Sequence, residues 1–303
     1  MPSSRRHIYF IVFSVVLLAL LAGPLSALVE YAWDWDNQNA SQIFLIPVIS
    51  LTLLYQLRRK IFEQAAYGVV PGILVATAGL ALVFLSRTEW AAGLKLGDRL
   101  SVSTSAMLIL LLSGFLFFYG ARSFRVAIFP LLFMVFAIPI PSPVMEKTIS
   151  ILQHGSADAS FVILRTAGMP IYRQDTTFMM PKDISIEIAP ECSGIRSGIS
   201  LLILSILACN MFLKTWWRRG ILLLVAIPIL IFKNGLRIST LSYLAVHVDP
   251  RILTSRLHQE GGIPFFILGL LLIYPILSLL IRSEKNRLEK NELVPSGTRE
   301  VNP

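Results

Sequence analysis

The sequence predicts an all-α, polytopic membrane protein that crosses the bilayer about eight times. Of its 303 residues, 55% are hydrophobic and 15% are charged, whereas a soluble domain carries roughly 25% charged residues. The mean hydropathy is +0.69, and several apolar stretches approach the length of about 20 residues that a spanning helix needs. Two cysteines exclude a disulfide framework and a cysteine-rich metal site. The net charge of +9 would suggest nucleic acid only in a soluble protein, so we expect no nucleic-acid partner.

Eight apolar stretches are the predicted transmembrane helices. In chain order they are Ile8–Val29, Ala40–Leu57, Ala65–Ser86, Leu100–Tyr119, Val126–Val144, Gly194–Leu213, Gly220–Ala245 and Gly261–Ile281. The second is short, four prolines interrupt the fifth, and the seventh contains Lys233 and Arg237. The first could instead be a cleaved signal peptide, but its apolar part exceeds the usual length of roughly 7–15 residues, which favours an uncleaved helix. No internal repeat is visible, so the sequence gives no support to an inverted-repeat transporter.

Basic residues predict the orientation, because cytoplasmic loops are enriched in Lys and Arg. With a cytoplasmic N-terminus and eight alternating helices, the inner segments hold 15 of the 27 basic residues but 5 of the 18 acids. The inner basic residues are Arg5, Arg6, Arg58, Arg59, Lys60, Arg122, Arg125, Lys214, Arg218, Arg219, Arg282, Lys285, Arg287, Lys290 and Arg299. We therefore expect a multi-pass protein of the cytoplasmic membrane with both termini in the cytoplasm.

Residues 145–193 form the one sizeable segment between predicted spans, on the outer side. Met145–Gly168 mixes polar and apolar residues and suits an interfacial helix better than a ninth span. Thr176–Met180 and Ile184–Ile188 flank a Pro-Lys-Asp turn, and isoleucine alternates with polar residues in the second run, which predicts a short hairpin. We expect one polytopic domain over residues 1–282 that includes this outer insert, followed by a polar cytoplasmic tail at 283–303.

Three chemically capable side chains are expected at one depth near the outer boundary. Cys192 lies at the outer end of the sixth span, where the helix dipole favours a thiolate and the neighbouring Glu191 opposes it. Arg237 lies about 26 Å up the seventh span from its inner start. His258 lies just before the eighth span. The topology predicts this common depth but says nothing about lateral contact.

A cysteine with a histidine is the minimum for nucleophilic catalysis by a thiol. His258 could accept the thiol proton and return it to a leaving amine. Arg237 could stabilise the oxyanion of a tetrahedral intermediate. Asn234 lies three residues before Arg237, on the same face of its helix. Arg196 likewise shares a face with Cys192.

Each candidate also has a purely structural interpretation. Cys192 could be a small packing residue, Arg237 an interfacial anchor, and His258 a solvated loop histidine. The rivals for the chemical roles are Ser193 and Ser197 as nucleophiles, and His154 and His247 as bases. A cysteine is the stronger nucleophile near neutral pH. Cys209 lies about 26 Å from Cys192 along the same helix, too far for a disulfide, and is expected to pack.

Three ordered sequence boxes span this region. They read APECSGIRS at 189–197, NGLR at 234–237 and HQEGG at 258–262. These boxes resemble A-x-x-C-S-G-x-R-S, N-x-x-R and H-x-x-x-G of the exosortase/archaeosortase family. SQIFLIP at 41–47 is similar to the family's S-H-G-F-L-x-P, with Gln42 where histidine is common, and the proline-rich fifth span also matches. The resemblance runs from about residue 30 to 281.

The resemblance implies a membrane cysteine protease-transpeptidase of the bacterial exosortase branch, because archaeal relatives often carry arginine at the position of His258. By motif, Cys192 is the nucleophile, Arg237 stabilises the oxyanion and His258 is the third member. The supporting residues of the boxes are Asn234, Arg196, Ser193 and Gly194. No cofactor or metal is implied. The fused C-terminal domain of some bacterial members is not expected here.

The resemblance also implies the partners. The substrates would be membrane-anchored proteins with a C-terminal sorting signal of the PEP-CTERM type, which is a short motif such as Pro-Glu-Pro, a transmembrane helix and a basic tail. A lipid or glycan amine, or water, would resolve the enzyme-bound thioester. The departure at Gln42 leaves the subfamily, and therefore the recognition motif, open.

Two other classes of protein remain open at this point. A transporter or channel component would bind an anionic solute with Lys233, Arg237 and Arg196, since charges inside a membrane usually serve a function. It predicts that Lys233 matters as much as Arg237 and that Cys192 is dispensable. A non-catalytic assembly factor for exported polysaccharide would tolerate the loss of all three candidate catalytic residues.

Overall fold

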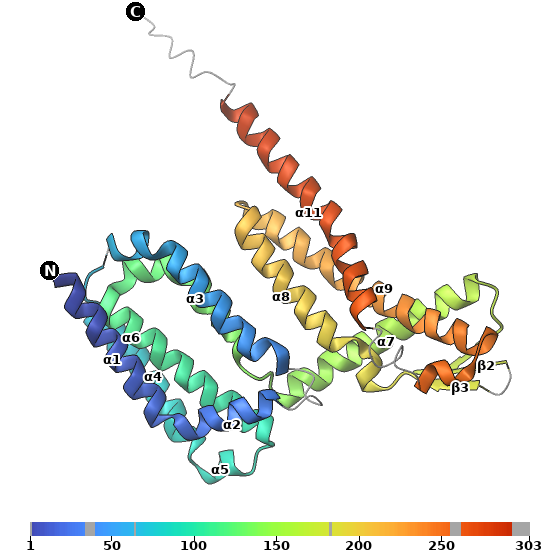
Figure 1. Ribbon diagram of the computed structural model, residues 1–303, viewed down its shortest axis with the longest axis horizontal. Coiled ribbons are helices and arrows are strands. Elements are labelled where there is room, and N and C mark those ends of the chain that lie inside the picture. Colours follow the sequence, from blue (N-terminus) through green and yellow to red (C-terminus); the bar gives the residue numbers. More distant parts are fainter. Residues whose placement is uncertain (1, 34–39, 64, 182–183, 255–261, 293–303) are drawn as a thin grey trace, which may run out of the picture. The chain divides into compact units, whose positions relative to one another are not determined.

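The computed structural model describes residues 2–33, 40–63, 65–181, 184–254 and 262–292, and it divides into two compact units (Figure 1). The first unit covers residues 1–146 and the second covers 147–303. Each unit is described by itself.

The regular elements described in the first unit are all helices. Its elements are α1 (Pro2–Leu20), α2 (Ala22–Trp33), α3 (Ala40–Glu63), α4 (Val69–Ser86), α5 (Glu89–Ala92), α6 (Leu96–Phe133) and the short 3₁₀ helix η1 (Met134–Ala137). Helices α1, α3 and α4 pack along α6. The core of this packing is aromatic, with Phe115 and Tyr119 of α6 in edge contact with Phe10 of α1.

The second unit combines helices with a small sheet. Its elements are α7 (Ser142–Thr166), which begins in the first unit, β1 (Tyr172–Gln174), β2 (Thr177–Met180), β3 (Ile184–Glu187), η2 (Pro190–Ser193), α8 (Ile195–Phe212), α9 (Trp216–His247), η3 (Pro250–Thr254) and α11 (Gly262–Glu292). Helices α8, α9 and α11 lie side by side (Figure 1).

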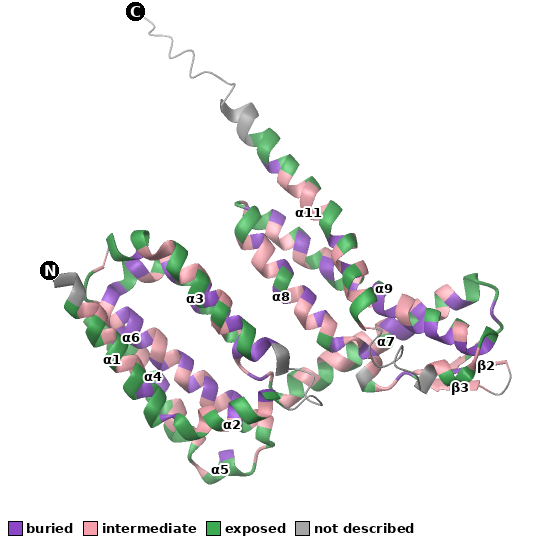
Figure 2. Ribbon diagram, viewed as in Figure 1, coloured by how far each residue is buried: buried purple, intermediate pink, exposed green. Residues whose placement is uncertain are grey.

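The all-α polytopic class is confirmed, but the number of eight spans is not. Among the described residues, five helices are long and apolar enough to cross a membrane, or six when one bent pair counts as a single span. Several of these helices carry large apolar residues that are exposed, and Figure 2 marks exposed positions along α11 in green. Phe84 of α4 is 75% exposed and Tyr274 of α11 is 68% exposed. Such surfaces suit contact with lipid.

The first predicted span differs from the structure because it is broken at Leu21. Helices α1 and α2 meet there at an angle of 73°. Gly23 and Pro24 follow directly, in the first turn of α2. Proline is tolerated in a first turn but not in a helix interior, since it lacks the N–H that the preceding turn requires. The sequence therefore stays apolar across the bend, whereas the helix axis changes direction there.

The fourth and fifth predicted spans are joined in α6 and end earlier than expected. The backbone leaves helical geometry at Gly120, with φ 77° and ψ 174°, between the two predicted stretches. The helix then gives way to η1 and to non-helical residues 138–141. The prediction of a helix as far as Val144 is wrong, because Pro139 and Pro141 supply no N–H for a continuing helix.

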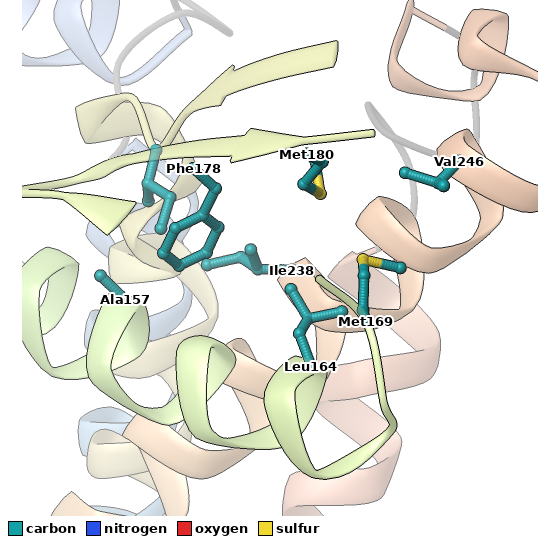
Figure 3. Close-up of a cluster of buried hydrophobic side chains, with 8 residues drawn as sticks. Ala157, Leu164, Met169, Phe178, Met180, Ile238 and Val246 are labelled. Atoms are coloured by element: carbon teal, nitrogen blue, oxygen red, sulfur yellow. The ribbon is translucent and has the colours of Figure 1, made fainter. Parts of the chain in front are cut away.

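The segment at residues 145–193 has the predicted helix and hairpin, and an additional strand. Helix α7 confirms the helix expected over Met145–Gly168, and β2 pairs antiparallel with β3. The unexpected strand β1 pairs antiparallel with the other side of β2, so the sheet order is β1-β2-β3. The sheet packs its buried face on α7 and α9 (Figure 3). There Phe178 and Met180 of β2 point toward Leu164 of α7 and Ile238 of α9.

Helix α11 continues to Glu292, beyond its predicted end at Ile281, and it holds the connection between α8 and α9. The Glu284 carboxylate accepts hydrogen bonds from the N–H groups of Lys214 at 2.9 Å and Thr215 at 2.8 Å. It also forms an ion pair with Arg218 of α9 at 3.1 Å. The side chains of both charged residues are at least nine-tenths buried. The first part of the predicted polar tail therefore continues the helix.

Replacement of Glu284 by alanine is expected to lower the free energy of unfolding by about 2–4 kcal/mol, because Arg218 would be left buried without its carboxylate. Thermal unfolding of the detergent-solubilised protein measures the effect. The control is Arg282→Ala, which removes an exposed charge from the same helix. Equal stability of the two variants would contradict the role assigned to the ion pair.

Candidate active site

The local fold around Cys192 is a tight turn that leads into α8. Pro190 opens η2, and the N–H of Cys192 donates to the carbonyl oxygen of Ala189 at 2.8 Å. Gly194 then adopts the left-handed conformation, with φ 75° and ψ 17°, and caps α8. This turn places the half-buried Cys192 three residues before the first residue of α8.

Asn234 of α9 holds this turn in place. Its side-chain Nδ2 donates to the carbonyl oxygen of Cys192 at 2.8 Å and to the hydroxyl of Ser156 on α7 at 3.0 Å. Asn234 is 2% exposed. A Cβ atom on residue 194 would lie 2.6 Å from Oδ1 of Asn234, so only glycine fits between the two. The Asn-x-x-Arg and Cys-Ser-Gly boxes therefore meet directly in space.

The same stretch of α9 is fastened to α7. The hydroxyl of Ser160 on α7 donates to the carbonyl oxygen of Gly235 at 3.0 Å, and that of Ser239 on α9 donates to the carbonyl oxygen of Ser160 at 3.3 Å. All of these groups are buried. Because α9 is bonded to α7 on one side and to the Cys192 turn on the other, its rotation about its own axis is fixed.

This rotation brings Arg237 and Cys192 to one cavity of about 260 Å³. One wall is the chain from Ser185 to Ala189, and the other is α9, which contributes Arg237, Ile238, Leu241 and Ser242. The lining of the cavity therefore includes a cysteine and an arginine together with polar and apolar residues. Such a cavity can take a peptide segment and polarise a carbonyl group next to the sulfur.

The other predicted residues occupy different places. Arg196 is exposed, and the buried hydroxyl of Ser193 has no hydrogen-bond partner in the part of the chain that the structure describes. Gly194 supports the site through its conformation. His258 lies outside the described residues.

The rival candidates do not line this cavity. Lys233 is 2% exposed and donates to the hydroxyl of Ser197, so it packs between helices. His154 bonds the carbonyl oxygen of Ser150, and His247 bonds that of Tyr243. The anion site of the transporter interpretation, which needs Lys233, Arg196 and Arg237 together, is therefore not assembled in this cavity. Among the described residues, His, Cys, Asp and Glu side chains form no group of three that could hold a metal ion.

Sequence reasoning missed two contributors to the site. Ser156 and Ser160 of α7 support α9, and their spacing of four residues on one helical face is a signal of close helix packing. The cavity wall formed by β3 was also missed, although the alternation of isoleucine with polar residues had predicted the strand itself.

Replacement of Gly194 by alanine is expected to destabilise the protein by about 1–2 kcal/mol through the left-handed backbone, and to reduce activity at least tenfold through displacement of Asn234. Gly168→Ala is the matched control, because Gly168 has φ 79° but nothing within 4 Å of an added Cβ atom. Thermal unfolding and precursor processing are measured for both. Equal loss of activity in the two variants would show that contact with Asn234 is unimportant.

These observations define a class of protein, a multi-pass membrane protein in which a thiol and a guanidinium face one cavity beside a small sheet. The model of the family described as transmembrane exosortase matches residues 34–275. The chain therefore belongs to the transmembrane exosortase family, as its sequence boxes predicted. Among curated proteins and among solved structures, nothing matches the chain.

Proposed function

We propose that this exosortase family member is a cysteine protease-transpeptidase that cleaves C-terminal sorting signals of exported proteins. The observation that carries the proposal is that Cys192 and Arg237 face one cavity, although they lie on different helices and far apart in the sequence. Membership of the exosortase family supports it. The buried bonds of Asn234 also support it, because they hold both residues in fixed positions before a substrate arrives.

The proposed reaction begins when His258 takes the proton of the Cys192 thiol. The resulting thiolate attacks the scissile carbonyl carbon, a sulfur–carbon bond forms and the carbonyl π electrons move to the oxygen. Arg237 stabilises the negative charge on the carbonyl oxygen. When the carbon–nitrogen bond breaks, His258 delivers a proton to the departing amine and a thioester remains on Cys192. A lipid or glycan amine, or water, then attacks the thioester and regenerates the thiol.

The proposed substrates carry a short motif of the Pro-Glu-Pro type, a transmembrane helix and a basic tail. In this proposal the substrate helix lies in the cytoplasmic membrane, and its motif reaches Cys192 on the outer face. Both termini of the enzyme lie in the cytoplasm, consistent with the distribution of Lys and Arg between the loops.

The experiment is to detect the covalent intermediate. The full chain is reconstituted in vesicles with a precursor that carries such a sorting signal, and the reaction is quenched with acid and analysed by mass spectrometry. We expect precursor cleavage together with an adduct on the Cys192 peptide that neutral hydroxylamine removes. Cys209 serves as the internal control, since it is buried away from the cavity. Cleavage that persists after complete alkylation of Cys192 would contradict the proposed mechanism.

A further inference from the structure

Strand β3 borders the active-site cavity with its edge. It is the terminal strand of the sheet, since the order is β1-β2-β3. Five consecutive residues, 185 to 189, line the cavity. A strand that presented one face would contribute alternate residues only, because successive side chains point to opposite sides. The cavity therefore runs along the backbone of β3.

The register of the sheet shows which backbone groups point into the cavity. Ile188 donates its N–H to the carbonyl oxygen of Thr176 at 3.0 Å, so these two residues form a hydrogen-bonded pair. Hydrogen-bonded and non-hydrogen-bonded pairs alternate along an antiparallel ladder. Ile186, opposite Phe178, is therefore also hydrogen-bonded to β2. The backbone groups of Ser185 and Glu187 consequently point away from β2, toward the free edge.

Three of these edge groups remain available for a ligand. The carbonyl oxygen of Glu187 accepts the N–H of Ala189 at 3.0 Å, which closes the edge at that point. The N–H and carbonyl groups of Ser185 and the N–H of Glu187 have no backbone hydrogen bond elsewhere in the described residues. Both residues are exposed. An unpaired strand edge is a template for another extended chain.

The opposite wall of the cavity also has an unsatisfied group. The hydroxyl of Ser242 on α9 is buried and has no hydrogen-bond partner among the described residues. Ile238 and Leu241 flank it with apolar surface. A buried hydroxyl without a partner is costly, so a ligand group that bonds to it would be favoured. The cavity thus offers backbone groups on one side and a hydroxyl on the other.

We propose that the sorting motif of the substrate binds as a fourth strand, parallel to β3, between β3 and α9. This proposal rests on the proposed function and specifies how that substrate is held. The direction follows from the two chains: β3 runs toward Cys192 and then into α8, and the substrate runs toward its scissile bond and then into its own helix. The two strands therefore point the same way.

In a parallel pairing, a single substrate residue lies between Ser185 and Glu187. Its N–H donates to the carbonyl oxygen of Ser185, and its carbonyl oxygen accepts the N–H of Glu187. The residues before and after it point their backbone groups toward α9, where Ser242 can donate to a carbonyl oxygen. Those two residues need no N–H, so prolines are tolerated there, as they are on the solvent side of an edge strand. A Pro-Glu-Pro segment fits this register with glutamate in the centre.

The first test compares two variants of one residue, Glu187→Pro and Glu187→Ala. Both lose the carboxylate, but only the proline variant loses the N–H, which is not used by the sheet. We expect the KM for precursor cleavage to be about tenfold higher in Glu187→Pro than in Glu187→Ala, with kcat similar in the two, because one hydrogen bond made in binding is lost. Equal KM values would overturn the strand proposal and leave the proposed function intact.

The second test leaves the protein unchanged. Short synthetic peptides that contain Pro-Glu-Pro, with either glutamate or N-methylglutamate in the centre, compete with the precursor for the wild-type protein in vesicles. N-methylation removes the central N–H, so we expect an inhibition constant about tenfold higher for the methylated peptide. Equal inhibition by the two peptides would overturn the strand proposal. If no Cys192-dependent cleavage of the precursor occurs, the proposed function fails, and the strand proposal fails with it.

Discussion

Replacement of Cys192 by alanine is expected to lower the rate of precursor cleavage by at least about 10⁴-fold, because loss of the nucleophile in comparable hydrolases has effects of this size or greater. In the proposed mechanism the thiol forms the covalent bond to the substrate. Its neighbours Ser193 and Ser197 have other positions, with Ser193 buried and Ser197 bonded to Lys233. The measurement is the rate at which the reconstituted protein shortens a precursor with a C-terminal sorting signal.

The control for this substitution is Cys209→Ala. Cys209 is 4% exposed in the core between α8, α9 and α11, and its removal changes packing without touching the cavity. We expect Cys209→Ala to retain cleavage activity and to lose some thermal stability. Normal cleavage in the Cys192→Ala protein would end the cysteine protease proposal and would favour an assembly or transport function.

Replacement of Arg237 by alanine is expected to reduce kcat by about 10²–10³-fold with little change in KM, the effect typical of removing one donor to an oxyanion. Arg237 faces the cavity that Cys192 also lines. In the proposed mechanism its charge acts where negative charge develops, so we expect the loss to fall on the transition state rather than on the bound substrate. Single-turnover cleavage of the precursor separates the two effects.

Lys233→Met is the matched comparison on the same helix. It removes a charge four residues away that bonds Ser197 instead of lining the cavity. We expect the kcat of Arg237→Ala to fall well below that of Lys233→Met. If the two variants lose activity equally, and Cys192→Ala loses none, an anion-binding transport function becomes the better explanation.

The sequence predicted most of the helices because apolar length is a local property. Helices α4, α8 and α9 begin and end within a few residues of the predicted spans. The bend at Leu21 was missed although Gly23 and Pro24 signal it, since hydropathy is continuous across it. Strand β1 was missed for a different reason: its three residues show no alternation, and pairing with β2 creates the strand.

The sequence predicted that Cys192 and Arg237 lie at the same depth along their helices. It did not predict that the two residues line the same cavity. Helical rise places Arg237 near the level of Cys192, whereas the rotation of α9 depends on contacts between distant residues. The hydrogen bond from Asn234 to the carbonyl oxygen of Cys192 fixes the rotation of α9 about its axis. The sequence identified Asn234 by its shared face with Arg237, but no local pattern states which backbone group its amide will bond.

The ion pair of Arg218 with Glu284 has a consequence for the thickness of membrane in which the site can work. Arg218 and Arg237 lie on one helix, about 29 Å apart along its axis, a separation close to the hydrocarbon thickness of about 30 Å. The buried ion pair fixes the predicted inner end of α9. Because the helix is rigid, it also fixes the distance from that end to the Arg237 guanidinium at the cavity. The spacing between anchor and guanidinium is therefore set by residue number, and a single inserted residue would turn Arg237 by about 100° relative to the anchor.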